Sequence, residues 1–248
     1  MIKLSDYSTL PPIDLEKGNA KKLTNKYAEE IGELHTKMAA DGKHSLLIVL
    51  QGMDSSGKDG AVRDVFKDCL PTVMRAHSFK KPTDEEFAHD FLWRCHKLAP
   101  RKGRTQIFIR SHYEDVLIQR VHNWIDEDRV AMRMEAINAW EKLLKADNNT
   151  TILKFYLHLS YEQQEIELQQ RIDEKDKHYK HNDGDWEERK HWDKYIECYE
   201  DVINKCSDTP WHIIPVDKRW YRSFKIAEIV KETMESWNLD YPPLVTNE

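Results

Sequence analysis

The sequence Gly52-Met53-Asp54-Ser55-Ser56-Gly57-Lys58-Asp59-Gly60 has the spacing of a phosphate-binding loop. Three of the eight glycines of the chain lie in it, and its lysine stands where a helix would begin. A strand-length apolar run, 45–50, precedes the loop, and apolar residues at helical spacing follow over 61–70, before Pro71. Backbone N–H groups of such a turn converge on phosphate oxygens. The stretch therefore predicts phosphate chemistry on an α/β fold.

Two aspartates distinguish this loop from the usual one. The residue after the lysine is commonly Ser or Thr, whose hydroxyl binds magnesium, whereas this chain has Asp59 there and adds Asp54 inside the loop. Carboxylates beside a polyanion repel it unless a divalent cation lies between them. We therefore expect Asp54, Asp59 or both to bind Mg²⁺. The alternative interpretation is a plain glycine turn with solvated aspartates.

Composition indicates one globular domain over residues 1–248. The chain is 40% hydrophobic and 33% charged, and no apolar run is long enough for a transmembrane span or a signal peptide. Its four cysteines form no CxxC pair, which argues against a zinc ribbon and against a secreted disulfide framework. We therefore expect a cytoplasmic protein with no membrane partner.

The charge pattern argues against nucleic acid and for a smaller polyanion. A formal net charge of -6 does not suit a protein that coats DNA or RNA. Two basic islands nevertheless stand out. The first comprises Lys80, Lys81, Arg94, His96, Lys97, Arg101, Lys102 and Arg104, and the second Arg171, Lys175, Lys177, Lys180 and His181. Each island alone is equally consistent with a solvated helix face; together with the phosphate loop they favour a polyanionic ligand.

Strands alternate with helices along the chain. We predict strands over 45–50, 73–79, 106–109, 151–159 and 211–216, and helices over 15–40, 61–70, 84–95, 116–121 and 131–145. A polar helical segment, 162–206, is interrupted at 181–184 and suits a mobile cover more than a core element. Such alternation predicts a parallel sheet with helices on both faces and a ligand at the carboxyl ends of the strands. The candidate sites 52–58, 110–115, 160–161 and 217–219 all follow a strand.

The residues at these strand ends suit phosphoryl transfer, in which positioning and charge neutralisation supply most of the rate. Lys58 and the loop backbone can hold one phosphate, and Arg110 can stabilise the group in transfer. Glu114 or Asp115 can orient a metal, a water shell or an accepting nucleotide. The alternative for Arg110 is a structural ion pair with Glu114, one helical turn on.

The chain resembles the polyphosphate kinase type 2 family, P-loop enzymes that move phosphate between inorganic polyphosphate and nucleotides. The resemblance covers most of the chain and depends on several motifs together. The matching segments are 52–60 with Arg63, 78–83 with Glu85 and Glu86, 89–94, 110–117 at the Walker B position, Arg171, Lys177, Tyr179 and Lys180, then Trp192, Pro210-Trp211, Asp217 and Arg222.

The resemblance implies a three-layer α/β/α P-loop kinase fold related to thymidylate kinases, with a helical lid about 162–206. It implies dependence on Mg²⁺, with Mn²⁺ as a possible substitute, and assembly as a homodimer or homotetramer. Glu114-Asp115 and the motif 89–94 resemble the subgroup that phosphorylates both AMP and ADP. The residues expected to bind phosphate or polyphosphate are Gly52, Ser55, Ser56, Gly57, Asp59, Gly60, Arg63, Lys80, Lys81, Arg94, Arg171, Lys177 and Lys180.

The sequence departs from the family pattern at three positions. Ile109 stands where Asp or Asn usually precedes the Arg-Ser pair, Lys175 where proline is common, and Tyr179 where tryptophan is common. Two other functions therefore stay open. One is an ATP-dependent nucleoside or nucleotide kinase of the same fold, which needs no polymer channel. The other is a nucleotide-binding regulator without turnover, which draws its support from Ile109.

Overall fold

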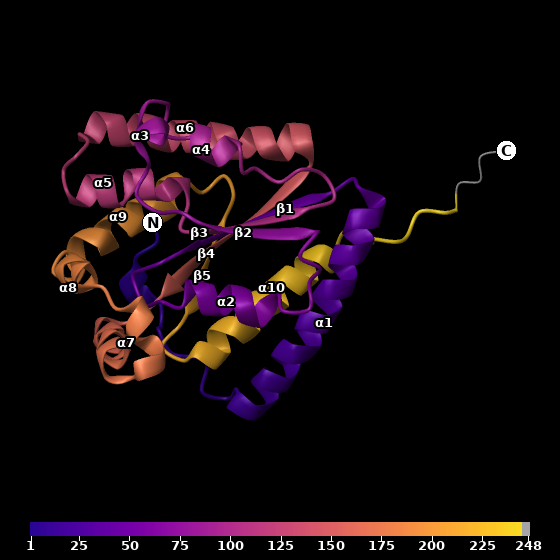
Figure 1. Ribbon diagram of the computed structural model, residues 1–248, viewed down its shortest axis with the longest axis horizontal. Helices are drawn as coiled ribbons and strands as arrows, with labels where there is room; N and C mark the ends of the chain where they lie inside the picture. The colour runs from indigo at the N-terminus through magenta and orange to yellow at the C-terminus, as the bar shows by residue number, and fades with distance from the viewer. Residues whose placement is uncertain (245–248) are drawn as a thin grey trace.

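A five-stranded parallel sheet forms the centre of the molecule in the computed structural model, which describes residues 1–244 (Figure 1). The strand order is β2-β3-β1-β4-β5. The strands are β1 (Ser45–Gln51), β2 (Met74–Ser78), β3 (Thr105–Ile109), β4 (Thr150–His158) and β5 (Trp211–Pro215). Because β1 pairs with β3 on one side and β4 on the other, the chain changes direction across the sheet there, where ligands bind in folds of this class.

Helices cover both faces of the sheet (Figure 1). The longer ones are α1 (Lys17–Asp41), α2 (Lys58–Val65), α6 (Glu127–Asn148), α7 (Tyr161–Asp173), α8 (Asp183–Arg189), α9 (Trp192–Lys205) and α10 (Arg219–Glu235). The short ones are α3 (Asp84–Phe87), α4 (Trp93–His96) and α5 (Ile118–Val121), with 3-10 turns η1 (Leu4–Asp6), η2 (His112–Val116) and η3 (Lys175–Lys180). Within residues 1–244, no helix is both long and apolar enough to cross a membrane.

The sequence of β1 explains why two apolar layers form. Successive side chains of a strand point to opposite faces, so a strand covered on both sides must be apolar throughout. Leu47 and Val49 pack with α6 and α9, whereas Leu46, Ile48 and Leu50 pack with α1, α2 and α10. The predicted three-layer α/β/α fold is therefore confirmed, and all five predicted strands are present.

Two predicted helices differ from the structure. The one predicted over 61–70 begins at Lys58 and ends at Val65, because Phe66 leaves helical geometry, with φ -111° and ψ 17°. The buried apolar residues after Val65 reach the core from turns, and their spacing in the sequence is the same as that of a helix. The helix predicted over 84–95 is two short helices, α3 and α4. Asp90 separates them, since its Oδ1 accepts a hydrogen bond from the Leu92 amide at 2.9 Å, a local bond that competes with helix.

The polar segment 162–206 is not uniform. A break separates η3 from α8 at residues 181–182, close to the predicted position. α9, however, buries Tyr195, Cys198, Tyr199, Val202 and Ile203 against the sheet. This half of the segment is a core element, contrary to the expectation from its charge, because its apolar residues recur at helical spacing on one face. Only α7, η3 and α8 remain candidates for a cover.

Candidate active site

The phosphate loop joins β1 to α2 at the central strand of the sheet. Gly52 approaches the neighbouring strand so closely that a Cβ there would lie 2.7 Å from the Leu157 carbonyl oxygen. Gly57 adopts φ +87°, a left-handed conformation that favours glycine, immediately before the helix begins at Lys58. The two glycines therefore place the loop against the sheet and turn its backbone into the N-terminus of α2, the arrangement that binds phosphate.

Lys58 is folded back onto the loop. Its Nζ donates to the carbonyl oxygens of Gly52 at 2.7 Å and Met53 at 3.1 Å. Burial, together with the nearby charge of Arg110, lowers the pKa of Lys58 to about 8. The ammonium group is thus held beside the loop before any ligand arrives, with a pKa close to neutral pH.

Arg110 pairs with Asp54 across the cleft, rather than with Glu114 as the structural alternative supposed. Both side chains are partly accessible, at 36% and 25%. Burial opposes ionisation of Asp54, but the charges of Arg110 and Lys58 together hold its pKa below the ordinary value. Arg110 itself has φ +56°, a conformation that costs a non-glycine residue about 1–3 kcal/mol. Strain of this kind is typical of functional sites.

Glu114 and Asp115 are neighbours with different surroundings. They lie on η2, whose start is capped by Ser111, since the Ser111 Oγ accepts from the Tyr113 amide at 3.2 Å. Asp115 is buried and accepts from Arg94 at 2.9 Å and from Gln119 at 2.6 Å. Glu114 forms no salt bridge within residues 1–244; burial raises its pKa, while the charges of Arg110 and Lys58 and a hydrogen bond with Gln51 oppose the rise. Glu114 is therefore the carboxylate left to face a ligand.

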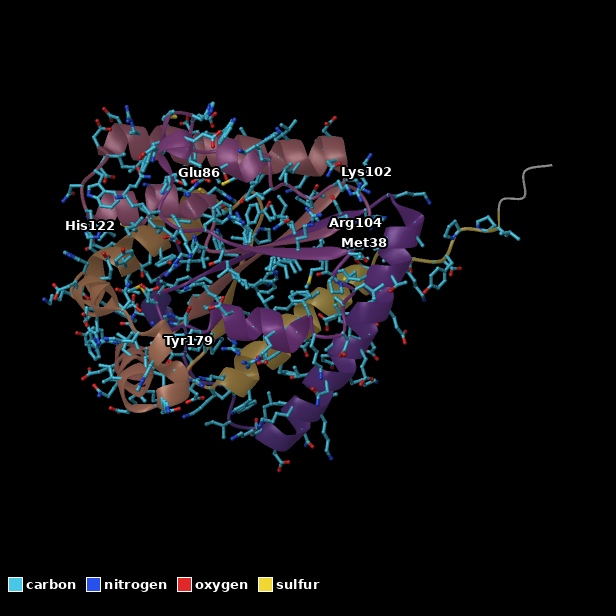
Figure 2. All side chains as sticks on the ribbon, in the orientation of Figure 1. Met38, Glu86, Lys102, Arg104, His122 and Tyr179 are labelled. Atoms are coloured by element: carbon cyan, nitrogen blue, oxygen red, sulfur yellow. The ribbon has the colours of Figure 1, made fainter. Side chains whose placement is uncertain are left out.

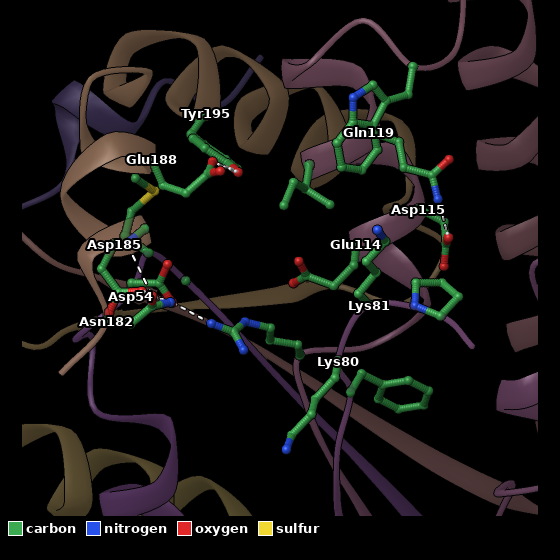
Figure 3. Close-up of a pocket in the computed structure, with 18 of the residues that line it drawn as sticks. Asp54, Lys80, Lys81, Glu114, Asp115, Gln119, Asn182, Asp185, Glu188 and Tyr195 are labelled. Carbon is green, nitrogen blue, oxygen red and sulfur yellow. Dashed lines mark hydrogen bonds and ion pairs between the residues drawn. The ribbon is translucent and has the colours of Figure 1, made fainter. Parts of the chain in front are cut away.

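A cavity of about 330 Å³ lies beside the loop (Figure 3). Eight predicted site residues line it: Gly52, Asp54, Lys80, Lys81, Arg94, Arg110, Glu114 and Asp115. Figure 3 shows Asp54 and Asp185 on one side of the cavity and Glu114, Lys81 and Asp115 on the other. Segments far apart in the sequence thus meet at the carboxyl ends of β1, β2 and β3, as the strand order predicts.

Other predicted residues lie outside this cavity. Asp59 is exposed on the first turn of α2, and Arg63 is exposed beside Asp64, 2.9 Å away. Lys177 donates to Gln170 at 2.8 Å. The remaining predicted residues that do not line the cavity are Ser55, Ser56, Gly57, Lys58 and Gly60 of the loop and Arg171 and Lys180 of the cover.

The basic islands are not continuous surfaces. Arg94 reaches the cleft, but Lys102 and Arg104 lie at the opposite end of the molecule from Tyr179 (Figure 2). Arg104 precedes β3 and therefore sits at the amino edge of the sheet. Arg171, from the second island, is paired with Asp185. Arg94 and Arg104 are close in sequence but lie at opposite ends of the sheet, because the chain returns from the carboxyl ends of the strands to their amino ends between them.

Several cavity residues were missed by the sequence analysis. Gln164 donates to the Asp54 carbonyl oxygen at 3.1 Å, and its side chain in turn accepts from Arg189 at 3.0 Å. Trp124 is 57% exposed and lines the cavity. No motif marks Gln164. For Trp124 the signal was present, since it follows a short helix directly after a candidate site.

The donor set fits a magnesium ion. Asp54 and Glu114 both line the cavity, and the buried Gln51 Oε1, at the end of β1, has no hydrogen-bond partner among residues 1–244. No group of three or more His, Cys, Asp or Glu side chains suited to a metal occurs in that range. Magnesium is usually held by one or two carboxylates together with waters and substrate phosphates, so two carboxylates beside a phosphate loop suffice.

Ile109 lies beneath this site in apolar surroundings. It is buried at the end of β3 and packs with the apolar layer that contains Leu50 and Val65. Its backbone still performs the local work of the strand end, because its carbonyl oxygen accepts from the Phe79 amide at 2.9 Å. The departure from the family pattern therefore replaces a polar side chain by an apolar one without disturbing the strand.

Comparisons with known proteins agree with this geometry. The family model described as "Polyphosphate kinase 2 (PPK2)" matches residues 14–241. An AMP/ADP-polyphosphate phosphotransferase of Meiothermus ruber is 44% identical over 225 residues, which is 90% of this chain and 83% of the relative. An ADP-polyphosphate phosphotransferase of Rhodopseudomonas palustris is 36% identical and covers 93% of this chain and 84% of the relative.

A solved structure extends the similarity to three dimensions. The crystal structure of polyphosphate kinase 2 from Arthrobacter aurescens TC1 superposes with a TM-score of 0.95 at 36% sequence identity. The alignment covers 100% of this chain and 90% of that one. The likeness therefore includes the sheet, both helical layers and the elements around the cleft.

Proposed function

The chain belongs to the polyphosphate kinase 2 family, and from this premise we propose that it transfers phosphoryl groups between inorganic polyphosphate and AMP or ADP. It is a phosphotransferase with a nucleotide substrate. One observation carries the proposal: a phosphate loop, a partly accessible arginine and a carboxylate that forms no salt bridge within residues 1–244 converge on one cleft at the carboxyl ends of parallel strands. The similarity to two phosphotransferases over more than four fifths of their lengths supports it.

The loop and two cations neutralise the phosphates. Lys58 moves its hydrogen bonds from the loop carbonyls to phosphate oxygens, and the backbone amides at the start of α2 bind beside it. Arg110 exchanges its ion pair with Asp54 for the oxygens of the group in transfer, which its planar fork matches well. Their combined charge offsets the charge that develops in the transition state.

Magnesium would supply positive charge that reduces the repulsion among phosphate oxygens. Asp54 and Glu114 are the residues that would hold it, because both face the cleft and supply hard oxygen ligands. Asp59 is a weaker candidate, since its side chain is exposed and does not line the cavity. Release of Asp54 from Arg110 would supply one ligand at the moment when a phosphate takes the guanidinium.

Part of the cavity lining suits a nucleoside. Phe87, Ile118 and Trp124 provide an apolar wall for a base, and Gln119 lies beside them. Lys80 and Lys81 bring positive charge to the same cavity, which favours the phosphates of the acceptor. Acceptance of both AMP and ADP rests on the Glu114-Asp115 pair and on the likeness to the Meiothermus ruber enzyme.

The cover is formed by α7, η3 and α8. It carries the predicted cations Arg171, Lys177 and Lys180, of which Arg171 is paired with Asp185 and Lys177 with Glu174. Tyr179 is 80% exposed on it (Figure 2). A polyphosphate chain would pass between this cover and the loop. Family resemblance further supports a homodimer or homotetramer in the cytoplasm, acting without nucleic acid or a membrane, and the four cysteines, buried and free, are consistent with a reducing compartment.

A donor and acceptor panel tests the proposal. Purified protein is incubated with MgCl₂ and long-chain polyphosphate, with AMP or ADP as acceptor, and in parallel with ATP and adenosine. We expect ADP from AMP and ATP from ADP, with polyphosphate as the donor. Turnover with ATP and adenosine alone would instead establish an ATP-dependent kinase. Nucleotide binding without exchange in either direction would establish a regulator.

A further inference from the structure

A charged pair lies in the middle of the apolar core. Lys154 interrupts the run Ile152–Leu157 of β4, and its ammonium group lies 2.9 Å from the Glu141 carboxylate of α6. The two side chains are 0% and 1% exposed. Burial opposes ionisation of Glu141, but the hydrogen bond with His112 and the charge of Lys154 lower its pKa to about 2. Glu141 is therefore a carboxylate deep inside the protein.

This pair is hydrogen bonded to the turn that carries the cleft carboxylates. The Tyr113 hydroxyl donates to Glu141 Oε1 at 2.7 Å and accepts from Lys154 Nζ at 2.9 Å. His112 Nε2 lies 3.4 Å from the same Glu141 oxygen. His112 and Tyr113 immediately precede Glu114 and Asp115 on η2, so the buried groups and the cleft groups sit on one short turn.

A third contact ties the pair to the residue that follows α9. Lys154 Nζ also donates to the Cys206 carbonyl oxygen at 2.8 Å, and Trp211 Nε1 donates to that oxygen at 3.1 Å. Cys206 follows α9, which supplies Tyr195 and Tyr199 to the cavity. The same ammonium group therefore fixes both η2 and the end of α9 relative to the sheet.

Stability alone does not account for such a pair. Taking two charges out of water costs more than their attraction returns in many proteins, and well-packed apolar residues of similar volume are often as stable or more so. A hydrogen-bonded buried network does, however, select one arrangement among several, because any other leaves charged groups unsatisfied. The network is thus suited to fixing the orientation of the turn it bonds.

We propose that Lys154, Glu141 and Tyr113 are positioning residues, which hold η2 so that Glu114 faces the cleft while Asp115 accepts from Arg94. The inference rests on the proposed phosphotransferase function. It assigns the buried groups no contact with substrate. They act through the backbone of a turn of five residues whose two ends serve different purposes, one in the core and one in the cleft.

The central experiment removes one hydroxyl. Tyr113→Phe breaks the bonds from the turn to the pair but leaves Lys154 and Glu141 in direct contact. We expect kcat to fall about 10- to 100-fold, the cost of a small misplacement, while the KM for polyphosphate stays within about twofold, because the loop and the cover proposed to hold the polymer are unchanged. The melting temperature should fall by no more than roughly 2–4 °C. Rates are normalised to the folded fraction measured by circular dichroism.

Tyr156→Phe is the matched control. Tyr156 is a fully buried tyrosine of β4, the strand that also carries Lys154, and it belongs to the same core as Tyr113. Its hydroxyl has no hydrogen-bond partner among residues 1–244. Its kcat should equal that of the wild type. Equal kcat values for Tyr113→Phe and Tyr156→Phe, in an active wild-type preparation, would overturn the inference.

A second pair of variants separates position from stability. Lys154→Met alone leaves Glu141 buried without its counter-charge and should lower the melting temperature sharply. Adding Glu141→Leu removes the second charge and should restore the melting temperature but not kcat. Recovery of both together would show that the pair serves stability alone. An inactive wild type in the polyphosphate assay would instead reject the proposed function. The melting temperatures do not depend on that function.

Discussion

Two ion pairs in this molecule have the same charges and opposite settings. Arg110 and Asp54 face the cleft with side chains 36% and 25% exposed, whereas Lys154 and Glu141 lie in the core at 0% and 1%. Solvent and an incoming polyanion can compete for the first pair. The second has no such competitor, because each of its groups is enclosed by hydrogen-bonding partners.

The difference shows how one turn joins binding to rigidity. The cleft pair holds an arginine beside the phosphate loop in a state from which a phosphate can displace the aspartate. The core pair, one strand away, fixes the neighbouring turn, whose Glu114 completes the cleft. Exchangeable charges lie where ligands arrive, and permanent charges lie where geometry must not change.

The cleft is disrupted most strongly by Lys58→Ala. Loss of the ammonium group that lies on the loop should reduce kcat by about 10²–10³-fold or more, the magnitude typical of removing one preorganised electrostatic donor. Transfer from polyphosphate to ADP is measured under saturating conditions, with circular dichroism to confirm folding. Activity within tenfold of the wild type would mean that Lys58 does not contact the transferred phosphate.

Asp54→Asn tests the exchange of partners within the cleft pair. If Asp54 holds magnesium after Arg110 leaves it, the variant should lose roughly tenfold in rate and regain part of the loss as Mg²⁺ is raised. Asp59→Asn, whose carboxylate is exposed, should cost less and show no such recovery. An unchanged rate in Asp54→Asn would exclude the metal role, and equal recovery in both variants would assign it to neither residue alone.

The core pair should respond in stability, with a defined pH dependence. Glu141→Gln leaves Lys154 uncompensated and should cost about 3–5 kcal/mol of unfolding free energy at neutral pH. The folded pKa of Glu141, about 2, is below its ordinary value of 4.5, so its stabilisation is complete above pH 4.5 and is lost as pH falls toward 2. The gap in unfolding free energy between the wild type and Glu141→Gln should therefore shrink as pH falls from 4.5 toward 2.

Urea unfolding at pH 7, 4.5 and 3 measures this gap. Glu135→Gln, an exposed glutamate of the same helix, is the control and should show a small gap at every pH. A gap for Glu141→Gln that does not change with pH would contradict a charged Glu141.

The buried lysine of the loop predicts an alkaline limb in activity. Because burial and Arg110 lower the pKa of Lys58 to about 8, the free enzyme loses this charge above that pH. We expect kcat/KM for polyphosphate to fall about tenfold per pH unit once the pH exceeds the Lys58 pKa of about 8. The pH profile is compared with that of nucleotide binding. A flat profile to pH 9.5 would show that the charge of Lys58 does not limit the reaction.

The smallest effect is expected at the cover. Replacing Lys177 and Lys180 by Ala should raise the KM for polyphosphate a few-fold, with little change for ADP, and the difference should diminish with added salt. Lys21→Ala with Lys22→Ala, two exposed charges on α1, is the control. Equal changes in both KM values for the cover variant would place these lysines outside a polyphosphate path.

Sequence patterns predicted the sheet, its strands and the loop because each has a local cause. A continuous run of apolar residues determines β1, and glycines at fixed spacing determine the turn after it. The ion pair of Arg110 with Asp54 was not predicted, and the helices around Asp90 were predicted incorrectly, since a side chain reaching across a cleft or back to its own backbone leaves no periodic signal. Lys154 was noted only as part of a strand, although a lysine in an apolar run was itself a signal of a buried partner.

The most direct test of the account follows one phosphate. Polyphosphate carrying a radioactive label in its terminal phosphate is mixed with ADP, MgCl₂ and the wild-type enzyme, and the nucleotides are separated after a single turnover. We expect label in the γ-phosphate of ATP, and none when Lys58→Ala replaces the wild type. Label that stays in the polymer, while ATP phosphorylates a nucleoside in the same preparation, would contradict it.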